Sequence, residues 1–143
     1  MILLDTNVIS ELMRETCDPV VAHWFSLNEG DAALPAIAIA ELAFGIAKLP
    51  DGARRNALAS QLAEWRLRFA ERSPGFTANT AMLYGEIMAG SRQQGRPMAI
   101  PDAQIAAIAR EQDCALATRN GKDFATASVT LIDPWDAKSS PRP

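Results

Sequence analysis

The sequence has few of the residues on which several common kinds of protein chemistry depend. Its 143 residues include one histidine, two cysteines and one tyrosine. With His23 as its single histidine, one chain cannot form a zinc site with several histidine ligands, and a Ser-His-Asp or Cys-His hydrolase is disfavoured. Two cysteines, Cys17 and Cys114, are too few for a disulfide scaffold, so we expect free thiols in a reducing compartment.

Other features of the chain are absent as well. No apolar run approaches the ~20 residues that a membrane helix needs. The N-terminus has no basic segment before its apolar residues, so we expect no secretory signal peptide and a cytoplasmic protein. The glycine motifs of dinucleotide-binding and P-loop proteins are missing, and a net charge of −3 does not suggest a broad basic surface.

The residues that are present describe an ordinary globular protein. Hydrophobic residues make up 48 % of the chain and charged residues 22 %, and 26 residues are alanine, which has the highest helix propensity. We expect one helix-rich domain over residues 1–136, followed by a disordered tail over residues 137–143.

Short apolar segments alternate with longer segments of helical periodicity. The pattern predicts strands over residues 2–4, 32–34, 114–117 and 129–132, and helices over residues 8–13, 19–27, 35–48, 53–72, 77–94 and 101–109. This alternation is typical of an α/β fold with a mostly parallel sheet covered on both faces. Ligands of such folds bind beyond the carboxyl ends of the strands.

Acidic and amide side chains follow two of these predicted strands. Asp5 comes directly after residues 2–4, and Asn120 and Asp123 follow residues 114–117. Each also has a simpler interpretation, because Asp5 is a good helix N-cap and Asp123 is of a type that is usually solvated.

Two further acids lie in predicted helices. Glu41 is the one charged residue among residues 36–47, which are otherwise apolar, so we expect residues 35–48 to form a buried helix. A buried carboxylate must be paired with an arginine, neutralised or bound to a metal. Asp102 directly follows Pro101 at a helix start, where the helix dipole alone would favour an acid.

Taken together, the four carboxylates suggest a cluster at one edge of the sheet. Such a cluster repels itself, and a bound divalent cation offsets that repulsion. Ligands that are all oxygen suit Mg²⁺ or Mn²⁺ better than zinc.

The acidic motifs resemble those of one family. The opening Leu3-Leu4-Asp5-Thr6-Asn7-Val8-Ile9-Ser10-Glu11-Leu12 is similar to that of PIN-domain toxins of the VapC type, in the FitB-like branch. Ala40-Glu41-Leu42, the segment from Gly95-Arg96-Pro97 through Asp102, Leu116-Ala117-Thr118-Arg119-Asn120 with Asp123-Phe124, and Ile132-Asp133-Pro134-Trp135 resemble later motifs in the same order. The resemblance implies an α/β/α sandwich with a central parallel sheet, and a Mg²⁺- or Mn²⁺-dependent endoribonuclease that is the toxin of a type II toxin–antitoxin pair.

The resemblance also implies roles for individual residues. Asp5, Glu41 and Asp102 would be the acidic, metal-binding and catalytic core, with Asp123 as the fourth acid. Many relatives have their fourth acid where this chain has Asn120, so either Asp123 would substitute for it or the second metal would bind weakly. Neutral hydrogen bonds would come from Thr6, Asn7, Thr118 and Asn120, and RNA phosphate contacts from Arg96, Arg119 and Lys122.

Partners and alternatives follow from the same motifs. We expect an RNA substrate, with transfer RNA the commonest in the family, a VapB- or FitA-like antitoxin and a homodimer, with no membrane association. Helices over residues 53–72 and 77–94 either supply apolar surface to the homodimer interface or pack within the monomer. One alternative is a catalytically silent PIN scaffold that binds only its antitoxin. The other is a small metal-dependent phosphatase, which is disfavoured because Asn7 stands where its second aspartate would be.

The acidic balance is compatible with RNA once the cluster is considered. The chain has 17 acidic and 14 basic residues. If four acids serve a metal site, 13 remain against 14 basic residues. We therefore expect RNA binding to depend on the divalent metal and on a local group of cations.

Overall fold

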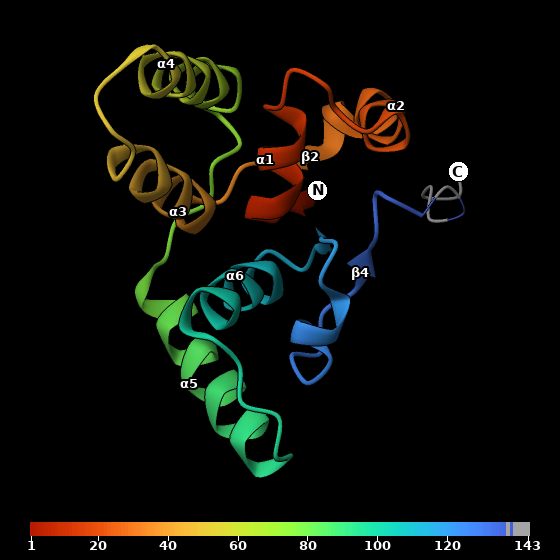
Figure 1. Ribbon diagram of the computed structural model, residues 1–143. Coiled ribbons are helices and arrows are strands. Elements are labelled where there is room, and N and C mark those ends of the chain that lie inside the picture. Colours follow the sequence, from red (N-terminus) through yellow and green to blue (C-terminus); the bar gives the residue numbers. More distant parts are fainter. Residues whose placement is uncertain (137, 139–143) are drawn as a thin grey trace.

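A four-stranded parallel sheet forms the centre of the molecule in the computed structural model, which describes residues 1–136 and 138 (Figure 1). The strands are β1 (Ile2–Leu4), β2 (Ala32–Ala33), β3 (Ala115–Ala117) and β4 (Leu131–Ile132). Their order in the sheet is β2-β1-β3-β4, with every pair parallel. The predicted parallel sheet is confirmed, although β4 is shorter than the predicted strand.

Six α-helices cover the sheet. They are α1 (Thr6–Leu12), α2 (Pro19–Asn28), α3 (Ala36–Ala47), α4 (Ala53–Arg68), α5 (Ala78–Gln93) and α6 (Ile100–Glu111), with short 3₁₀ helices η1 (Glu29–Asp31) and η2 (Gly121–Phe124). Figure 1 shows α1 to α4 on one side of the strands and α5 and α6 on the other. The predicted α/β/α sandwich is therefore confirmed.

Side chains alternate between the two faces of the sheet and so divide the core in two. Leu4 of β1 lies in a cluster with Trp24 and Phe69, from α2 and the end of α4. The preceding residue, Leu3, lies in a second cluster with Ile105 of α6. Successive strand residues point to opposite faces, so a strand buried on both sides is apolar throughout, as residues 2–4 are.

Helix starts follow from their capping residues. The Asp18 side chain accepts a hydrogen bond from the Val20 amide at 2.9 Å, and Pro19 occupies the first position of α2. Thr77 caps α5 in a reciprocal arrangement with Thr80. Both starts agree with the sequence prediction to within one residue.

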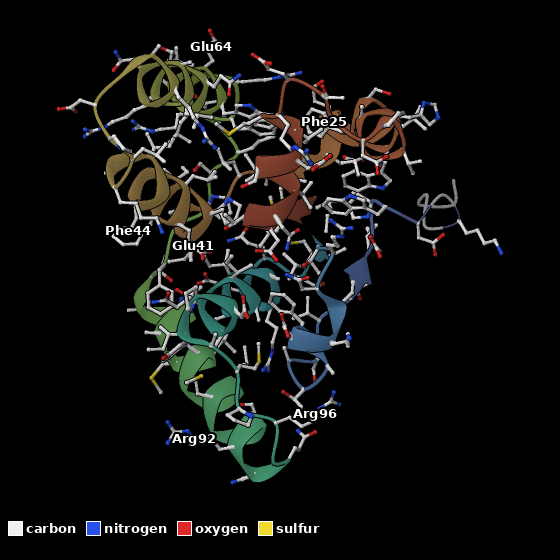
Figure 2. The ribbon with its side chains drawn as sticks, viewed as in Figure 1. Phe25, Glu41, Phe44, Glu64, Arg92 and Arg96 are labelled. Atoms are coloured by element: carbon white, nitrogen blue, oxygen red, sulfur yellow. The ribbon has the colours of Figure 1, made fainter. Side chains whose placement is uncertain are left out.

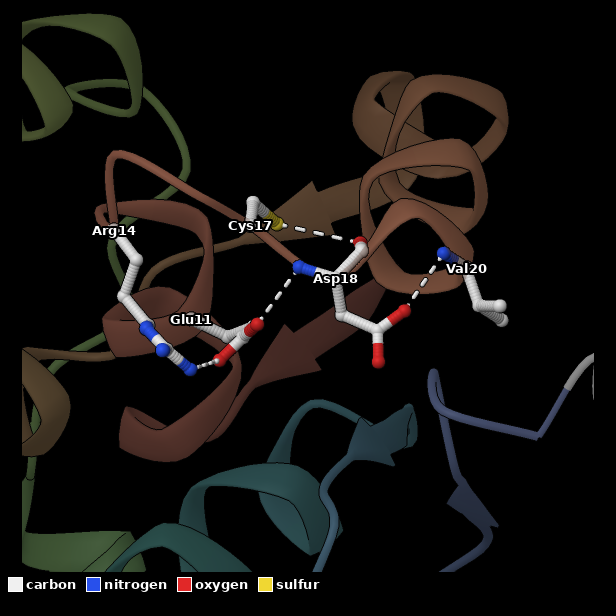
Figure 3. A network of polar contacts seen from close by, with 5 residues as sticks. All are labelled: Glu11, Arg14, Cys17, Asp18 and Val20. Atoms are coloured by element: carbon white, nitrogen blue, oxygen red, sulfur yellow. Dashed lines mark hydrogen bonds and ion pairs between the residues drawn. The ribbon is translucent and has the colours of Figure 1, made fainter.

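Glu11 fixes the turn between α1 and α2, a role that was not predicted from the sequence. One carboxylate oxygen accepts from the Asp18 amide at 2.8 Å, and the other accepts from Arg14 at 3.1 Å (Figure 3). These bonds, the amide of Asp18 first, hold the pKa of Glu11 below its usual value. Glu11 thereby links the end of α1 to the N-cap of α2.

Two predictions about burial are wrong. The apolar segment around Glu41 forms α3, but only Ala38 and Leu42 of this helix are buried. Phe44 is 68 % exposed, and Met82, one of the apolar residues at helical spacing in the predicted helix over residues 77–94, is 75 % exposed. Alanine and phenylalanine are compatible with a helix whether or not a partner covers them, so composition did not distinguish a core helix from a surface helix.

The expectations about disulfides, membrane helices and the tail can be compared only with the residues that the structure describes. Both cysteines are free. Over residues 1–136 and 138, no helix combines the length and apolar character needed to cross a membrane. The predicted tail lies outside the described residues, apart from Lys138.

The aromatic cluster at the end of α4 generates a stability prediction. Phe69 is fully buried, and its ring centroid lies 5.5 Å from that of Trp65 in a stacked arrangement. Replacing Phe69 with alanine should lower the free energy of unfolding by about 3–5 kcal/mol, measured by urea denaturation. The control is Leu67→Ala, because Leu67 is 80 % exposed; an equal loss in both variants would contradict this assignment of the core.

Candidate active site

The sheet topology determines where a crevice opens. From β1 the chain continues to β2 at one edge of the sheet, and from β3 it continues to β4 at the opposite edge. The β1/β3 junction is therefore the point where the strand order reverses, and in open α/β sheets ligands bind beyond the carboxyl ends of the strands at this point. The residues that directly follow β1 and β3 are Asp5 and Thr118.

Asp5 is held by hydrogen bonds from both strand ends. Its Oδ1 accepts from the Thr6 amide at 2.8 Å, and its Oδ2 accepts from Thr118 Oγ1 at 2.8 Å and from Asn7 Nδ2 at 3.1 Å. Asp5 is also the N-cap of α1, so the simpler interpretation from the sequence holds as well. Only 5 % of the residue is exposed. Burial raises the pKa of Asp5 despite the three hydrogen bonds, which act in the opposite direction.

Neutral polar groups connect the segments that follow β1 and β3. Asn7 Oδ1 accepts from the Arg119 amide at 3.2 Å, and Thr118 Oγ1 accepts from the Asn120 amide at 3.1 Å. The side chain of Asn7 thus joins the segment after β1 to the segment after β3. Thr6, Asn7, Thr118 and Asn120, the four neutral residues selected from the sequence, all lie in this network.

Glu41 reaches the same edge from α3. Its Oε1 accepts from Thr6 Oγ1 at 2.8 Å, and the residue is partly exposed. Figure 2 shows Glu41 on the side of α3 that faces α6. Among the described residues it makes no ion pair with any arginine, so the buried salt bridge considered from the sequence is wrong.

Asp102 lies in the first turn of α6, as the sequence predicts, and the charges of the other acids act on it. Its pKa is raised to about 6, first by burial and then by the negative charges of Asp5, Asp123 and Glu41. Each of the four acids selected from the sequence therefore belongs to one electrostatic cluster. We call these four residues the acidic centre.

Asp123 and Asn120 occupy different positions in the segment after β3. Asp123 is exposed, and its charge raises the pKa of both Asp5 and Asp102. Asn120 contributes its backbone, because its carbonyl accepts from the Asp123 amide at 2.9 Å. The negative charge in this segment thus comes from Asp123, and Asn120 shapes the turn that presents it.

The donor atoms of the acidic centre suit a hard divalent cation. Every side chain in it offers carboxylate oxygen, and the mutual repulsion expressed in the pKa of Asp102 is the kind that such a cation relieves. In the part of the chain that the structure describes, no three acidic, histidine or cysteine side chains already surround one ion position. The chemistry of the donors therefore fits a cation, whereas the side chains are not preassembled as a closed cage.

Cationic side chains lie beside the acidic centre. Arg96 and Lys122 line a pocket of about 280 Å³ together with Pro97, Asp123 and Thr126. The guanidinium carbon of Arg119 lies 5.0 Å from the centre of the Trp135 ring. The three cations selected from the sequence are exposed, and two of them share one pocket.

Sequence reasoning missed a groove between α1, α3 and α4. The groove has a volume of about 960 Å³. Its lining includes Glu41 of the acidic centre and Thr6, which donates a hydrogen bond to Glu41. Its walls are mostly apolar, with Leu42, Ile46 and Leu58 among them. The apolar residues of α3 and α4 were the available signal, but the α3 segment was expected to be buried and the α4 segment was considered only for a homodimer interface or for packing within the monomer.

Comparison with known proteins agrees with this geometry. The PIN domain family matches residues 2–129. The chain is 39 % identical to the toxin FitB of Neisseria gonorrhoeae over 94 % of this chain and 99 % of that protein, and 36 % identical to the VapC ribonuclease Y4jK of Sinorhizobium fredii over 95 % and 99 %. The solved structure of FitAB bound to a DNA fragment superposes with a TM-score of 0.87 at 37 % identity, covering 95 % of this chain and 96 % of that one. The chain belongs to the PIN domain family, in the branch that contains FitB and the VapC ribonucleases.

Proposed function

We propose that the protein is a divalent-metal-dependent endoribonuclease and the toxin of a type II toxin–antitoxin pair. The observation that carries the proposal is the acidic centre, in which the charges of Asp5, Glu41 and Asp123 all act on Asp102. Relatives named as a toxin, as VapC ribonucleases and, at 26 % identity, as a tRNA(fMet)-specific endonuclease support it. The acidic centre supplies the groups that phosphodiester hydrolysis requires.

Asp5, Asp102, Glu41 and Asp123 would hold one or two Mg²⁺ or Mn²⁺ ions. When bound, such an ion lowers the pKa of a coordinated water and stabilises charge on the phosphate. Asp5 presents its carboxylate in one orientation because hydrogen bonds from Thr6 and Thr118 fix it. Both donors are neutral, so they orient the carboxylate without pairing it with a positive charge.

Glu41 and Asp123 have supporting roles in the proposed reaction. Thr6 holds one oxygen of Glu41, and the other oxygen has no hydrogen-bond partner among the described residues. That free oxygen is placed to orient the attacking water or to take its proton. Asp123, on the exposed side of the centre, would support a second ion.

The two alternative functions have less support. A catalytically silent scaffold was considered because Asn120 replaces an acid, but the charge of Asp123 reaches Asp5 and Asp102. A phosphatase would need a second acid in place of Asn7, whose amide instead donates to Asp5. Metal titration with total RNA distinguishes a ribonuclease from a silent scaffold, because a silent scaffold leaves RNA intact at every metal concentration.

Two surfaces suit the expected protein partners. The apolar groove that begins at Glu41 would accept an apolar segment of a VapB- or FitA-like antitoxin, next to the carboxylates that it would inhibit. Phe44 on α3, Met82 on α5 and Ile100 on α6 are large exposed apolar residues, and we assign them to a homodimer interface. In this proposal the domain spans residues 1–136 and acts in the cytoplasm.

One prediction concerns the reaction itself. Asp5→Asn and Asp102→Asn should each reduce Mg²⁺- or Mn²⁺-dependent RNA cleavage at least about 100-fold, because each removes charge from the acidic centre. Asp31→Asn is the matched control, since Asp31 is exposed and lies in η1. Cleavage is followed on denaturing gels, with circular dichroism to verify folding. Full activity of either centre variant would refute the assignment.

The raised pKa of Asp102 predicts how pH changes the stability of the metal-free protein. Because the pKa of about 6 exceeds the ordinary value of 3.8, the folded state binds the proton more tightly than the unfolded state. Stability should fall as pH rises from about 4 through 6. Because Asp102 is partly exposed, solvent screening limits the effect of its ionisation on the free energy of unfolding to roughly 1 kcal/mol. Asp102→Asn should therefore raise the melting temperature at pH 7 by about 2–4 °C in EDTA.

The same measurement has two internal controls. The difference between the variant and the unsubstituted protein should disappear at about pH 3 and below, where Asp102 is largely protonated in the folded and the unfolded state. Added Mg²⁺ should stabilise the unsubstituted protein more than Asp102→Asn. An unchanged melting temperature in EDTA at pH 7 would contradict the electrostatic account of the acidic centre.

The exposed face of α3 generates a prediction about assembly. Phe44→Lys should convert the dimer to a monomer in sedimentation or light scattering, because a charge on an apolar interface is costly to bury. Leu27→Lys is the control, since Leu27 is 64 % exposed and lies on a different helix, α2. A dimer that survives Phe44→Lys would place the interface elsewhere.

A further inference from the structure

The pocket between the α5–α6 connection and η2 joins two cations to the acidic centre. Its lining residues are Arg96, Pro97, Lys122, Asp123 and Thr126, and we call it the basic pocket. Asp123 is shared, because its charge also acts on Asp5 and Asp102. The basic pocket is thus the immediate neighbour of the acidic centre.

We propose that the basic pocket binds a phosphate of the RNA strand other than the one that is cleaved. The inference rests on the proposed ribonuclease function and specifies how the strand is held. Four carboxylates surround the site of cleavage and repel the polyanionic substrate. A cationic pocket for a neighbouring phosphate offsets that repulsion without placing a cation among the carboxylates.

The charges of Arg96 and Lys122 are available for a ligand. Among the described residues neither forms an ion pair, whereas four other arginines do. Both side chains are exposed. Arginine presents a planar set of donors that matches phosphate oxygens, lysine adds a point charge, and the Thr126 hydroxyl adds a neutral donor.

The backbone holds the two sides of the basic pocket in place. Gly95 has a φ of +68°, which favours glycine, and the Arg96 amide donates to the Ser91 carbonyl at 2.9 Å. Ser91 Oγ also accepts from the Met98 amide at 3.3 Å, so the connection is tied to α5 on both sides of Arg96. On the other wall, the hydrogen bond from Asp123 to Asn120 starts the 3₁₀ helix that carries Lys122.

The size of the basic pocket indicates which part of RNA it takes. Its volume of about 280 Å³ is at the lower limit of pockets that enclose a small organic ligand, about 300–1,000 Å³. It has no aromatic wall on which a base would stack. A phosphate group satisfies the charge and fits the space, and recognition by charge alone carries no base preference.

The test measures RNA binding separately from cleavage. In an Asp102→Asn background, which removes catalysis, a short fluorescein-labelled single-stranded RNA is titrated at several salt concentrations. Arg96→Gln with Lys122→Gln should weaken binding about tenfold and reduce the salt dependence by about 0.7 for each lost phosphate contact. The charge-retaining pair Arg96→Lys and Lys122→Arg should preserve the salt dependence.

Arg92→Gln serves as the matched control for lost charge. Arg92 is exposed on α5, and Figure 2 shows it on the other side of that helix end from Arg96. It does not line the basic pocket. If Arg92→Gln weakened RNA binding equally, the loss would reflect the net charge of the protein and the proposal would be overturned. Unchanged RNA binding in the double variant would overturn it as well.

A second substrate separates the basic pocket from the acidic centre. Bis(p-nitrophenyl) phosphate has only the phosphate that is cleaved, so Arg96→Gln with Lys122→Gln should leave its Mn²⁺-dependent hydrolysis unchanged while raising the KM for RNA. Equal loss on both substrates would overturn the proposal. RNA binding that requires Arg96 and Lys122 in a protein without hydrolytic activity would support the pocket and refute the ribonuclease function.

Discussion

The burial of Asp5 at the reversal point of the sheet is the constraint on which the rest of the site depends. A carboxylate that is 5 % exposed is stable only when hydrogen bonds replace lost water. Thr6, Asn7 and Thr118 supply those bonds, and they come from the ends of two adjacent strands. Because β1 and β3 are paired in fixed register, the position of Asp5 is set by the sheet itself.

Stability and function conflict around this residue. Asp102 is brought near Asp5 by the first turn of α6, at the cost of a raised pKa. A fold selected for stability alone would neutralise one of these acids or pair it with an arginine. Instead, no ion pair with a basic residue is formed by the acidic centre among the described residues, and Arg96 and Lys122 line a neighbouring pocket that shares Asp123 with it. Strain of this kind is characteristic of sites that bind a cation or carry out catalysis.

Most of the fold could be predicted from the sequence because its signals are local. Apolar residues 2–4, the Asp18-Pro19 helix start and the cap at Thr77 each depend on neighbours in the chain. Burial of α3 could not be predicted in this way. Most of its apolar residues are not buried, and a hydrophobic pattern alone does not distinguish a core helix from an apolar helix at the surface. The role of Glu11 was also missed, because its partner amide at Asp18 depends on how the intervening turn folds.

The candidate site shows the same division between residue identity and arrangement. Motif order selected Asp5, Glu41, Asp102 and Asp123, but only the structure shows that Glu41 has a hydroxyl partner in Thr6 and no arginine. The net charge of −3 is similarly uninformative until it is divided in space. Negative charge is concentrated at the β1/β3 junction, and unpaired positive charge stands beside it. A polyanion can therefore approach an acidic protein, because its phosphates meet local fields of opposite sign and not the average charge of the chain.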